Sequence, residues 1–113
     1  MTLQTDLEQF TGTLAYHKLT LLPVLATDGV RYLVEKAGAF WLVDDIAAVY
    51  ITKKNEHPFI GVTVTSKDEK AVIKYTNGNY KTIHIQEYNY TDLPAGEYKL
   101  FITDGVLMLP SEY

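Results

Sequence analysis

The hydrophobic residues of this 113-residue chain change their spacing near residue 55, and this change limits the fold more than any other feature. Before it, apolar residues recur every three or four positions, as on one face of an α-helix. After it, apolar and polar residues alternate, as in a β-strand with one buried face. The pattern predicts an α+β protein, with N-terminal helices packed on one face of a four- or five-stranded antiparallel sheet, a meander.

The first expected helix covers residues 3–10, and Gly12 follows as its stop signal. Its apolar face consists of Leu3, Leu7 and Phe10. Residues 11–27 have a mixed pattern interrupted by Pro23, which indicates extended or irregular chain. The sequence leaves open whether this segment is a strand of the sheet or a loop over it.

Two further helices are expected between residues 27 and 51. Either Thr27 or Asp28 can cap the first of them, and Gly38 can end it. Its apolar positions are Val30, Leu33, Val34 and Ala37. The next helix runs from about residue 39 to residue 51, and its buried stripe is predicted to consist of Ala39, Leu42, Ile46, Val49 and Tyr50.

Asp44 and Asp45 interrupt the apolar run of this last helix. Adjacent helical residues point about 100° apart, so the two carboxylates cannot face one substrate from the same side. With Leu42 and Ile46 inward, Asp44 should lie beside the buried stripe and Asp45 should point largely away from it. We interpret the pair as a solvated helix face, and a catalytic or metal-binding role for either carboxylate is the alternative.

Alternation with period two predicts strands at residues 60–65, 71–75, 82–86, 97–102 and 106–109. Two pairs of these strands are separated by sequences typical of tight hairpin turns, which need positive φ angles. These are Asn77-Gly78 and Asp104-Gly105.

One face of the strand at residues 82–86 is a candidate interaction surface. If Ile83 and Ile85 face the core, the residues between and beside them share the opposite face. This candidate surface consists of Tyr80, Thr82, His84, Gln86 and Tyr88. Protein contact sites favour tyrosine and have little charge at their centre, although a polar sheet face can also simply meet water. A third interpretation extends the face to Tyr75 and Tyr90 as a small-ligand site, for which the sequence offers no anchoring charge.

Several kinds of chemistry lack the residues they need. The chain has no cysteine, which excludes disulfides, thiolate catalysis and cysteine-based zinc sites. Its two serines, Ser66 and Ser111, lie outside any nucleophile elbow, its histidines show no metal-ligand spacing, and its glycines form no phosphate-binding motif. We therefore expect no catalytic residues, no metal and no cofactor. If the protein were nevertheless an enzyme, its acid–base groups would come from Asp28, Glu35, Asp44, Asp45 or His84.

The charge pattern limits the partners. The net charge is −4, and only Lys53-Lys54 approaches a basic cluster, so direct binding of nucleic acid is not expected. No run reaches the roughly 20 apolar residues of a membrane span, and the acidic N-terminus does not resemble a signal peptide. These features predict one cytoplasmic domain over residues 1–113 that does not contact membranes.

Four segments together resemble a known family: FTGT at residues 10–13, TDGVRYLVEKAGAFWLVDDIA at 27–47, YTDLP at 90–94 and GVLMLPSEY at 105–113. The family consists of small bacterial and mobile-element proteins known only as a domain of unknown function. Phe40 stands where tyrosine is more common in that family. The resemblance brings no activity or site residue, and its association with phages and plasmids implies a small regulatory or host-interaction protein.

These observations favour a non-catalytic interaction or regulatory protein that binds another protein or a second copy of itself. Two alternatives remain open. One is a small enzyme or ligand-binding protein with a carboxylate or histidine site. The other is an acidic nucleic-acid mimic or host-interaction protein of a mobile element, which would need carboxylates gathered on one face.

Overall fold

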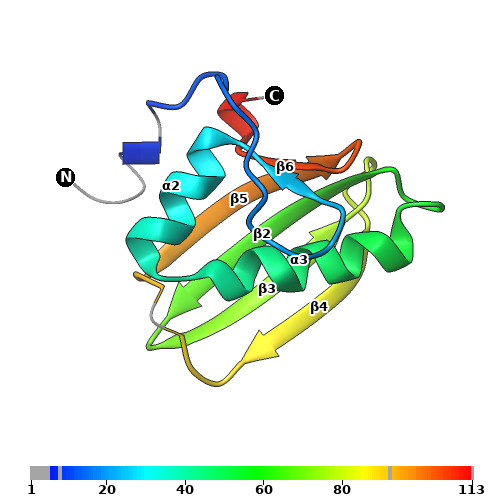
Figure 1. The fold of residues 1–113 in the computed structure, drawn as a ribbon. Coiled ribbons are helices and arrows are strands. Elements are labelled where there is room, and N and C mark those ends of the chain that lie inside the picture. Colours follow the sequence, from blue (N-terminus) through cyan, green and yellow to red (C-terminus); the bar gives the residue numbers. More distant parts are fainter. Residues whose placement is uncertain (1–5, 8, 92, 113) are drawn as a thin grey trace.

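Two long helices follow one another along the chain between residues 28 and 53 (Figure 1). In this computed structural model, which describes residues 6–7, 9–91 and 93–112, helix α2 spans Asp28–Ala37 and helix α3 spans Phe40–Lys53. Gly38 between them has a left-handed backbone with φ of 64°, and its N–H bonds the carbonyl of Val34. Glycine takes this conformation without steric cost, so α2 ends there as predicted.

The buried face of α3 is broader than the predicted stripe. Ala39, at the start of the helix, and Leu42, Ile46 and Tyr50 are buried as expected. Val43 and Ala47 are also fully buried, whereas Val49 is only partly buried. The helix is therefore covered on the side that carries Val43 and Ala47 as well as along the predicted line.

The predicted helix at residues 3–10 is described only in part, because Leu3 lies outside the described residues. Asp6 and Leu7 are helical, and Leu7 and Phe10 pack against the core. The following segment is irregular, as expected, up to strand β1 (Leu25–Ala26). An isolated antiparallel bridge also joins His17 to Ala26.

Five longer strands follow the helices with the predicted alternation of buried and exposed residues. They are β2 (Phe59–Lys67), β3 (Lys70–Thr76), β4 (Thr82–Tyr88), β5 (Gly96–Thr103) and β6 (Val106–Met108). The chain ends in a short 3₁₀ turn, η1 (Pro110–Glu112).

One of the two predicted tight turns is confirmed. At the other position β3 and β4 form an antiparallel hairpin as expected, but their connection is not a tight Asn-Gly turn. Asp104 and Gly105 have φ angles of 52° and 74°, as a tight turn between β5 and β6 requires. In the β3–β4 connection the left-handed residue is Tyr80, with φ of 64°, and not Gly78. The turn is longer than predicted because the side chain of Asn77 accepts hydrogen bonds from the N–H groups of Asn79 and Lys81 at 2.9 and 3.0 Å.

The described strands form a six-stranded mixed sheet in the order β1-β6-β5-β2-β3-β4. The α+β class is confirmed, but the predicted antiparallel meander is wrong in two respects. Strand β5 pairs with β2 and not with β4, which gives a Greek-key order. Strand β1 adds to β6 in parallel.

The connection between β4 and β5 explains this order. It crosses the end of the β2–β3 hairpin, where the N–H of Thr91 donates to the carbonyl of Glu69 at 2.7 Å. The hydroxyl of Ser66 donates to the carbonyl of Leu93 at 2.9 Å. These bonds carry the chain past β3 to the free edge of β2.

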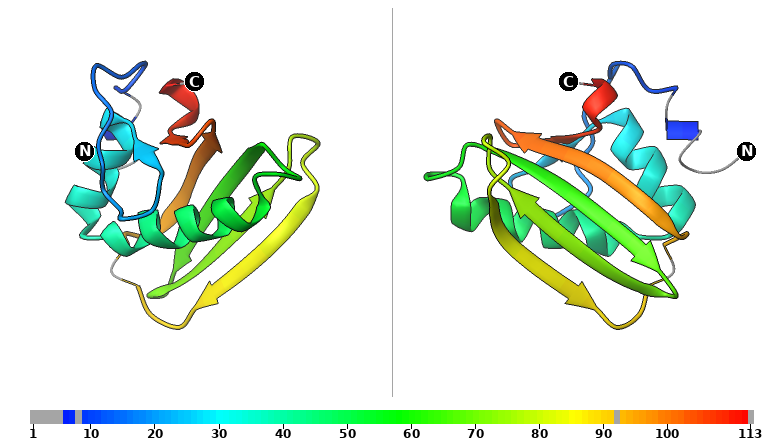
Figure 2. Two further views of the ribbon diagram at one scale, coloured as in Figure 1. Left: turned by 45° about the vertical axis from the view of Figure 1, so that its right-hand side comes forward. Right: turned by 180° about the vertical axis from the view of Figure 1, so that it is seen from behind.

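Helices α2 and α3 both lie on one side of the sheet, and within the described part of the chain no helix covers the other side (Figure 2). The hydrophobic core fills the space between α2, α3 and the sheet, and its largest fully buried side chain is that of Tyr75. Within the described residues, no helix combines the length and the apolar character that a membrane crossing requires.

Candidate functional site

Three side chains meet where the first half of α3 passes over the end of β4. Trp41 and Asp45 are four residues apart in α3 and therefore lie on the same face of the helix. Tyr88 is the last residue of β4, and its ring lies against Trp41 with a centroid distance of 4.9 Å and an interplanar angle of 49°. The hydroxyl of Tyr88 donates a hydrogen bond to the Asp45 carboxylate.

An open pocket of about 410 Å³ lies over this contact, and we call it the α3–β4 pocket. Its lining consists of Trp41, Asp45, Tyr88, Tyr90 and Thr91. Tyr90 forms the outer wall, with 66% of its surface exposed. Thr91 is buried, and its hydroxyl oxygen accepts the N–H of Leu93 at 3.1 Å. The lining thus combines three aromatic rings with one carboxylate.

The environment of Tyr88 keeps its phenol protonated. Burial and the hydrogen bond to Asp45 both raise the pKa of Tyr88 well above its usual value. The phenol therefore stays a hydrogen-bond donor to Asp45 at any physiological pH. This bond fixes the carboxylate at the pocket wall.

A second layer of aromatic groups lies behind the pocket. Tyr75 is fully buried, and its ring packs against His84 with a centroid distance of 5.5 Å. Its hydroxyl is enclosed and has no hydrogen-bond partner among the described residues. Burial and the nearby charge of Asp45 raise the pKa of Tyr75. Tyr75 therefore stays uncharged behind the pocket at physiological pH.

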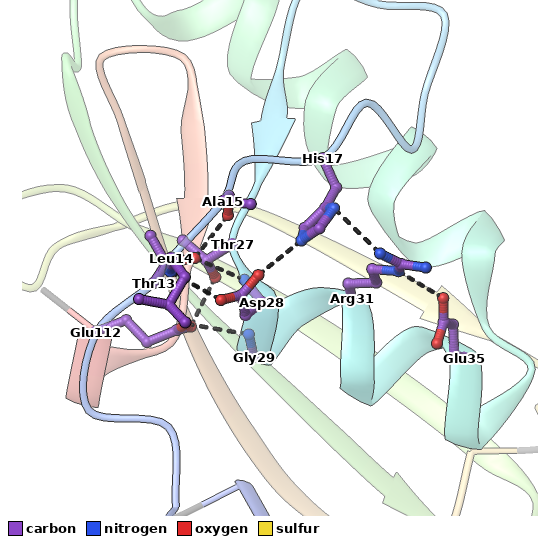
Figure 3. Close-up of polar contacts among 10 residues, drawn as sticks. All are labelled: Thr13, Leu14, Ala15, His17, Thr27, Asp28, Gly29, Arg31, Glu35 and Glu112. Carbon is purple, nitrogen blue, oxygen red and sulfur yellow. Dashed lines mark hydrogen bonds and ion pairs between the residues drawn. The ribbon is translucent and has the colours of Figure 1, made fainter.

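A separate cluster of polar side chains joins the N-terminal segment to α2 (Figure 3). His17 Nε2 donates to Asp28 at 2.7 Å, while Arg31 donates to His17 Nδ1 at 3.3 Å. The N–H of Leu14 donates to the other Asp28 oxygen at 2.8 Å. The bond from His17, followed by that from Leu14, holds the pKa of Asp28 below its usual value of 3.8.

Glu112 from the C-terminal turn caps the start of α2 in the same cluster (Figure 3). Its carboxylate accepts hydrogen bonds from the Thr27 hydroxyl at 2.6 Å, the Gly29 N–H at 3.0 Å and the Leu109 N–H at 3.1 Å. The prediction that Thr27 or Asp28 caps this helix is confirmed for Thr27 as the N-cap residue, but the side chain of Thr27 makes no capping bond and the Glu112 carboxylate accepts the Gly29 N–H instead. A Cβ at Gly29 would lie 2.6 Å from Glu112 Oε1, so only glycine permits this approach.

The polar cluster serves the fold, because each of its carboxylates is already held by backbone N–H groups and neighbouring side chains. The five candidate acid–base groups do not form a site either. Among the described residues, no hydrogen bond or ion pair joins any two of Asp28, Glu35, Asp44, Asp45 and His84. Within the same part of the chain, no three metal-ligating side chains come together.

A model of a protein family matches the whole chain, from residue 1 to residue 113, and its description is "Family of unknown function (DUF6876)". The chain belongs to DUF6876. Comparison with curated proteins and with solved structures found no match. The predicted membership of a family of unknown function is thus confirmed, and the roles of residues in this DUF6876 protein have to be argued from its geometry.

The predicted face of β4 is formed only at the start of the strand in this DUF6876 protein: Thr82 is exposed and Ile83 packs against the core as expected, but the alternation is reversed from His84 onward. Tyr75, Ile73 and Ala71 are buried, and they pair across β3 with His84, Gln86 and Tyr88, which therefore face the helices. Ile85 points the other way and is 53% exposed. The cause is an irregularity in the β3–β4 register next to Tyr75 and Thr76, which shifts the alternation by one residue.

The five residues of the candidate surface are consequently divided. Tyr80 lies in the exposed turn, Thr82 is exposed at the start of β4, and the other three face inward and are half-buried. Of the five, only Tyr88 lines the α3–β4 pocket. A binding role for the whole set remains a prediction.

The expected positions of Asp44 and Asp45 are reversed. Asp44 is exposed, whereas Asp45 is half-buried and bonds Tyr88. The sequence offers Tyr90 as part of a ligand site but no anchoring charge for that site. Asp45 supplies the charge, and its spacing of four residues from Trp41 is the sequence signal that places both side chains on one helix face.

Proposed function

We propose that this protein is a non-catalytic interaction module that binds a positively charged side chain of a partner protein in the α3–β4 pocket. The observation that carries the proposal is the combination of three aromatic rings and one carboxylate around a single open pocket. Within this proposal the protein acts in the bacterial cytoplasm. A phage or plasmid origin would make a host protein the expected partner.

The chemistry of the lining favours a cation. The faces of tryptophan and tyrosine rings carry negative charge density, and a cation over such a ring gains about 0.5–2 kcal/mol, depending on how far it is desolvated. Asp45 adds a full negative charge at the wall, held in place by Tyr88. Tryptophan, tyrosine and arginine are also the residues that most often dominate binding energy at protein interfaces.

The enzymatic alternative has less support. Catalysis by general acids and bases needs two groups within reach of one reacting atom. Among the described residues that line the α3–β4 pocket, Asp45 is the one charged side chain, and its neighbour Tyr88 is held protonated. A nucleic-acid mimic would need several carboxylates gathered on one face, whereas the described lining of this pocket contains one.

Fluorescence of Trp41 tests the proposal directly, because Trp41 is the only tryptophan of the chain and lines the pocket. Blocked lysine and arginine derivatives should change the emission in a saturable way, with a Kd on the order of 1 mM for a single side chain. A blocked norleucine derivative, which lacks the charge, should have little effect. Equal binding of norleucine and lysine would contradict the proposal.

The two adjacent carboxylates provide a matched pair of variants. Asp45→Asn should weaken binding of the lysine derivative about tenfold, since a charge-assisted contact contributes about 1.5–3 kcal/mol. Asp44→Asn removes an exposed carboxylate one position away and should leave binding unchanged.

Light scattering over a range of concentrations adds a test for self-association. A dimer that dissociates when the lysine derivative is added would identify a second copy of the chain as the partner.

A further inference from the structure

We infer that the cation of the α3–β4 pocket is a methylated lysine side chain of a partner protein, and not an unmodified ammonium or guanidinium group. This inference rests on the proposed function and names the ligand of the same site. It follows from the described residues of the lining, which offer a cation three aromatic rings but one charged acceptor.

An ammonium group brings three N–H donors and a guanidinium group brings five. Each donor that is buried without an acceptor weakens binding, because it loses its hydrogen bonds to water. Among the described lining residues the charged acceptor is Asp45; its Oδ2 atom already accepts the hydroxyl of Tyr88, and its Oδ1 atom can still accept. The hydroxyl oxygen of Thr91 already accepts the N–H of Leu93. The described lining therefore offers an ammonium or guanidinium group fewer charged acceptors than the group has donors, and the remaining donors have to keep their water.

A methylated ammonium group removes this difficulty. Trimethylation replaces all three N–H donors with methyl groups while the positive charge stays. The methyl groups can lie against the rings of Trp41, Tyr88 and Tyr90, where attraction between the cation and the aromatic faces needs no acceptor. Asp45 then balances the charge from the wall. Recognition of methyl-lysine and choline by aromatic side chains follows the same chemistry.

The position of the pocket favours a side chain on a polypeptide over a free small molecule. Strand β4 lies at the edge of the sheet, and its last residue, Tyr88, forms part of the lining. An edge strand offers unpaired backbone groups to which an extended peptide can add. A partner segment beside β4 would thus carry a lysine side chain into the pocket. The volume of about 410 Å³ is within the usual range for a ligand site.

The test compares four probes by Trp41 fluorescence on the full chain. They are blocked trimethyl-lysine, blocked lysine, a neutral analogue of trimethyl-lysine with carbon in place of the quaternary nitrogen, and choline. We expect trimethyl-lysine to bind about tenfold more tightly than lysine and more tightly than both other probes. Tyr90→Leu should reduce binding of trimethyl-lysine several-fold, and Asp44→Asn, which lies outside the pocket, is the control. Tyr90 is mostly exposed, so these variants should fold, and circular dichroism checks that they do.

Each result separates the inference from the proposed function. If lysine binds as tightly as trimethyl-lysine, the methylation inference is overturned while the proposed function stands. If the neutral analogue binds as tightly as trimethyl-lysine, or if no probe binds, both are overturned. If choline binds more tightly than trimethyl-lysine, the ligand is a free quaternary ammonium compound and the assignment to a partner protein is wrong.

Discussion

Asp44 and Asp45 are adjacent in the sequence but lie in different environments, and this difference shows what a single residue contributes to the site. A rotation of about 100° separates the two side chains on α3. Val43 and Ala47 are buried in addition to the predicted stripe, so the half-buried side of the helix includes Asp45 and leaves Asp44 in solvent. The sequence indicated that the carboxylates diverge. Packing against Tyr88 decides which of the two carboxylates meets the sheet. Helical spacing alone does not predict that packing.

Asp28 provides a pH-dependent test at the scale of one residue. Its carboxylate binds a proton less readily in the folded protein than in the unfolded chain, because His17 and the N–H of Leu14 bond the charged form. Its contribution to stability is complete above the unfolded pKa of 3.8 and is lost as pH falls through the lower pKa of the folded state. We expect Asp28→Asn to lower the urea midpoint at neutral pH. The difference from the wild-type protein should shrink at a pH of about 2–3.

A control distinguishes this effect from general acid denaturation. Glu35→Gln breaks an exposed ion pair with Arg31 and should change stability by no more than about 0.5 kcal/mol. A constant difference between Asp28→Asn and wild type at all pH values would show that the carboxylate acts through its shape and not through its charge.

At the scale of elements, periodicity identified α2, α3 and the five longer strands, while the face of β4 was assigned wrongly. Alternation locates a strand because it reports one buried face. It does not report a shift in register, and in β4 such a shift beside Tyr75 and Thr76 exchanges the two faces. The same strand lies at the sheet edge, where Ile85 is 53% exposed, so apolar residues there do not mark the core reliably.

The β3–β4 turn offers a test at this scale. Tyr80 has a left-handed backbone, which costs a residue with a Cβ roughly 1 kcal/mol relative to glycine. We expect Tyr80→Gly to stabilise the protein by about 0.5–1 kcal/mol in urea unfolding. Gly78 is the matched position, because a Cβ there would meet no atom within 4 Å. Gly78→Ala should be tolerated. If Gly78→Ala destabilised the protein and Tyr80→Gly gave no gain in stability, the left-handed residue would be Gly78, as the sequence suggested.

At the scale of the whole molecule, the sequence predicted the class but not the order of the strands. The meander assumed that consecutive strands are neighbours. The connection at residues 89–95 is longer than a tight hairpin turn, and its length was the available signal that β5 need not pair with β4. The α3–β4 pocket depends on this connection because it carries Tyr90 and Thr91 to the first half of α3. Local patterns therefore gave the elements, and long-range contacts between them created the site.

Glu112 illustrates such a long-range contact, because its carboxylate joins the C-terminal turn η1 to the start of α2. Glycine is unfavourable within a helix, so Gly29 in the first turn of α2 was a signal that another segment approaches closely. Removing the carboxylate with Glu112→Ala leaves the Gly29 N–H, the Leu109 N–H and the Thr27 hydroxyl without their shared acceptor. We expect a loss of about 1–3 kcal/mol in urea unfolding at neutral pH.

Two variants show whether that loss comes from capping. Ser111→Ala changes an exposed neighbour in the same turn and should leave stability nearly unchanged. Glu112→Gln retains one oxygen that can accept from Gly29 but places an amide donor toward the remaining groups, so its stability should fall between those of the alanine variant and the wild type. If Glu112→Ala were as stable as Ser111→Ala, the contact between the chain end and α2 would not contribute to folding. In that case the first turn of α2 would depend on Thr13, whose hydroxyl accepts the N–H of Asp28 at 3.0 Å.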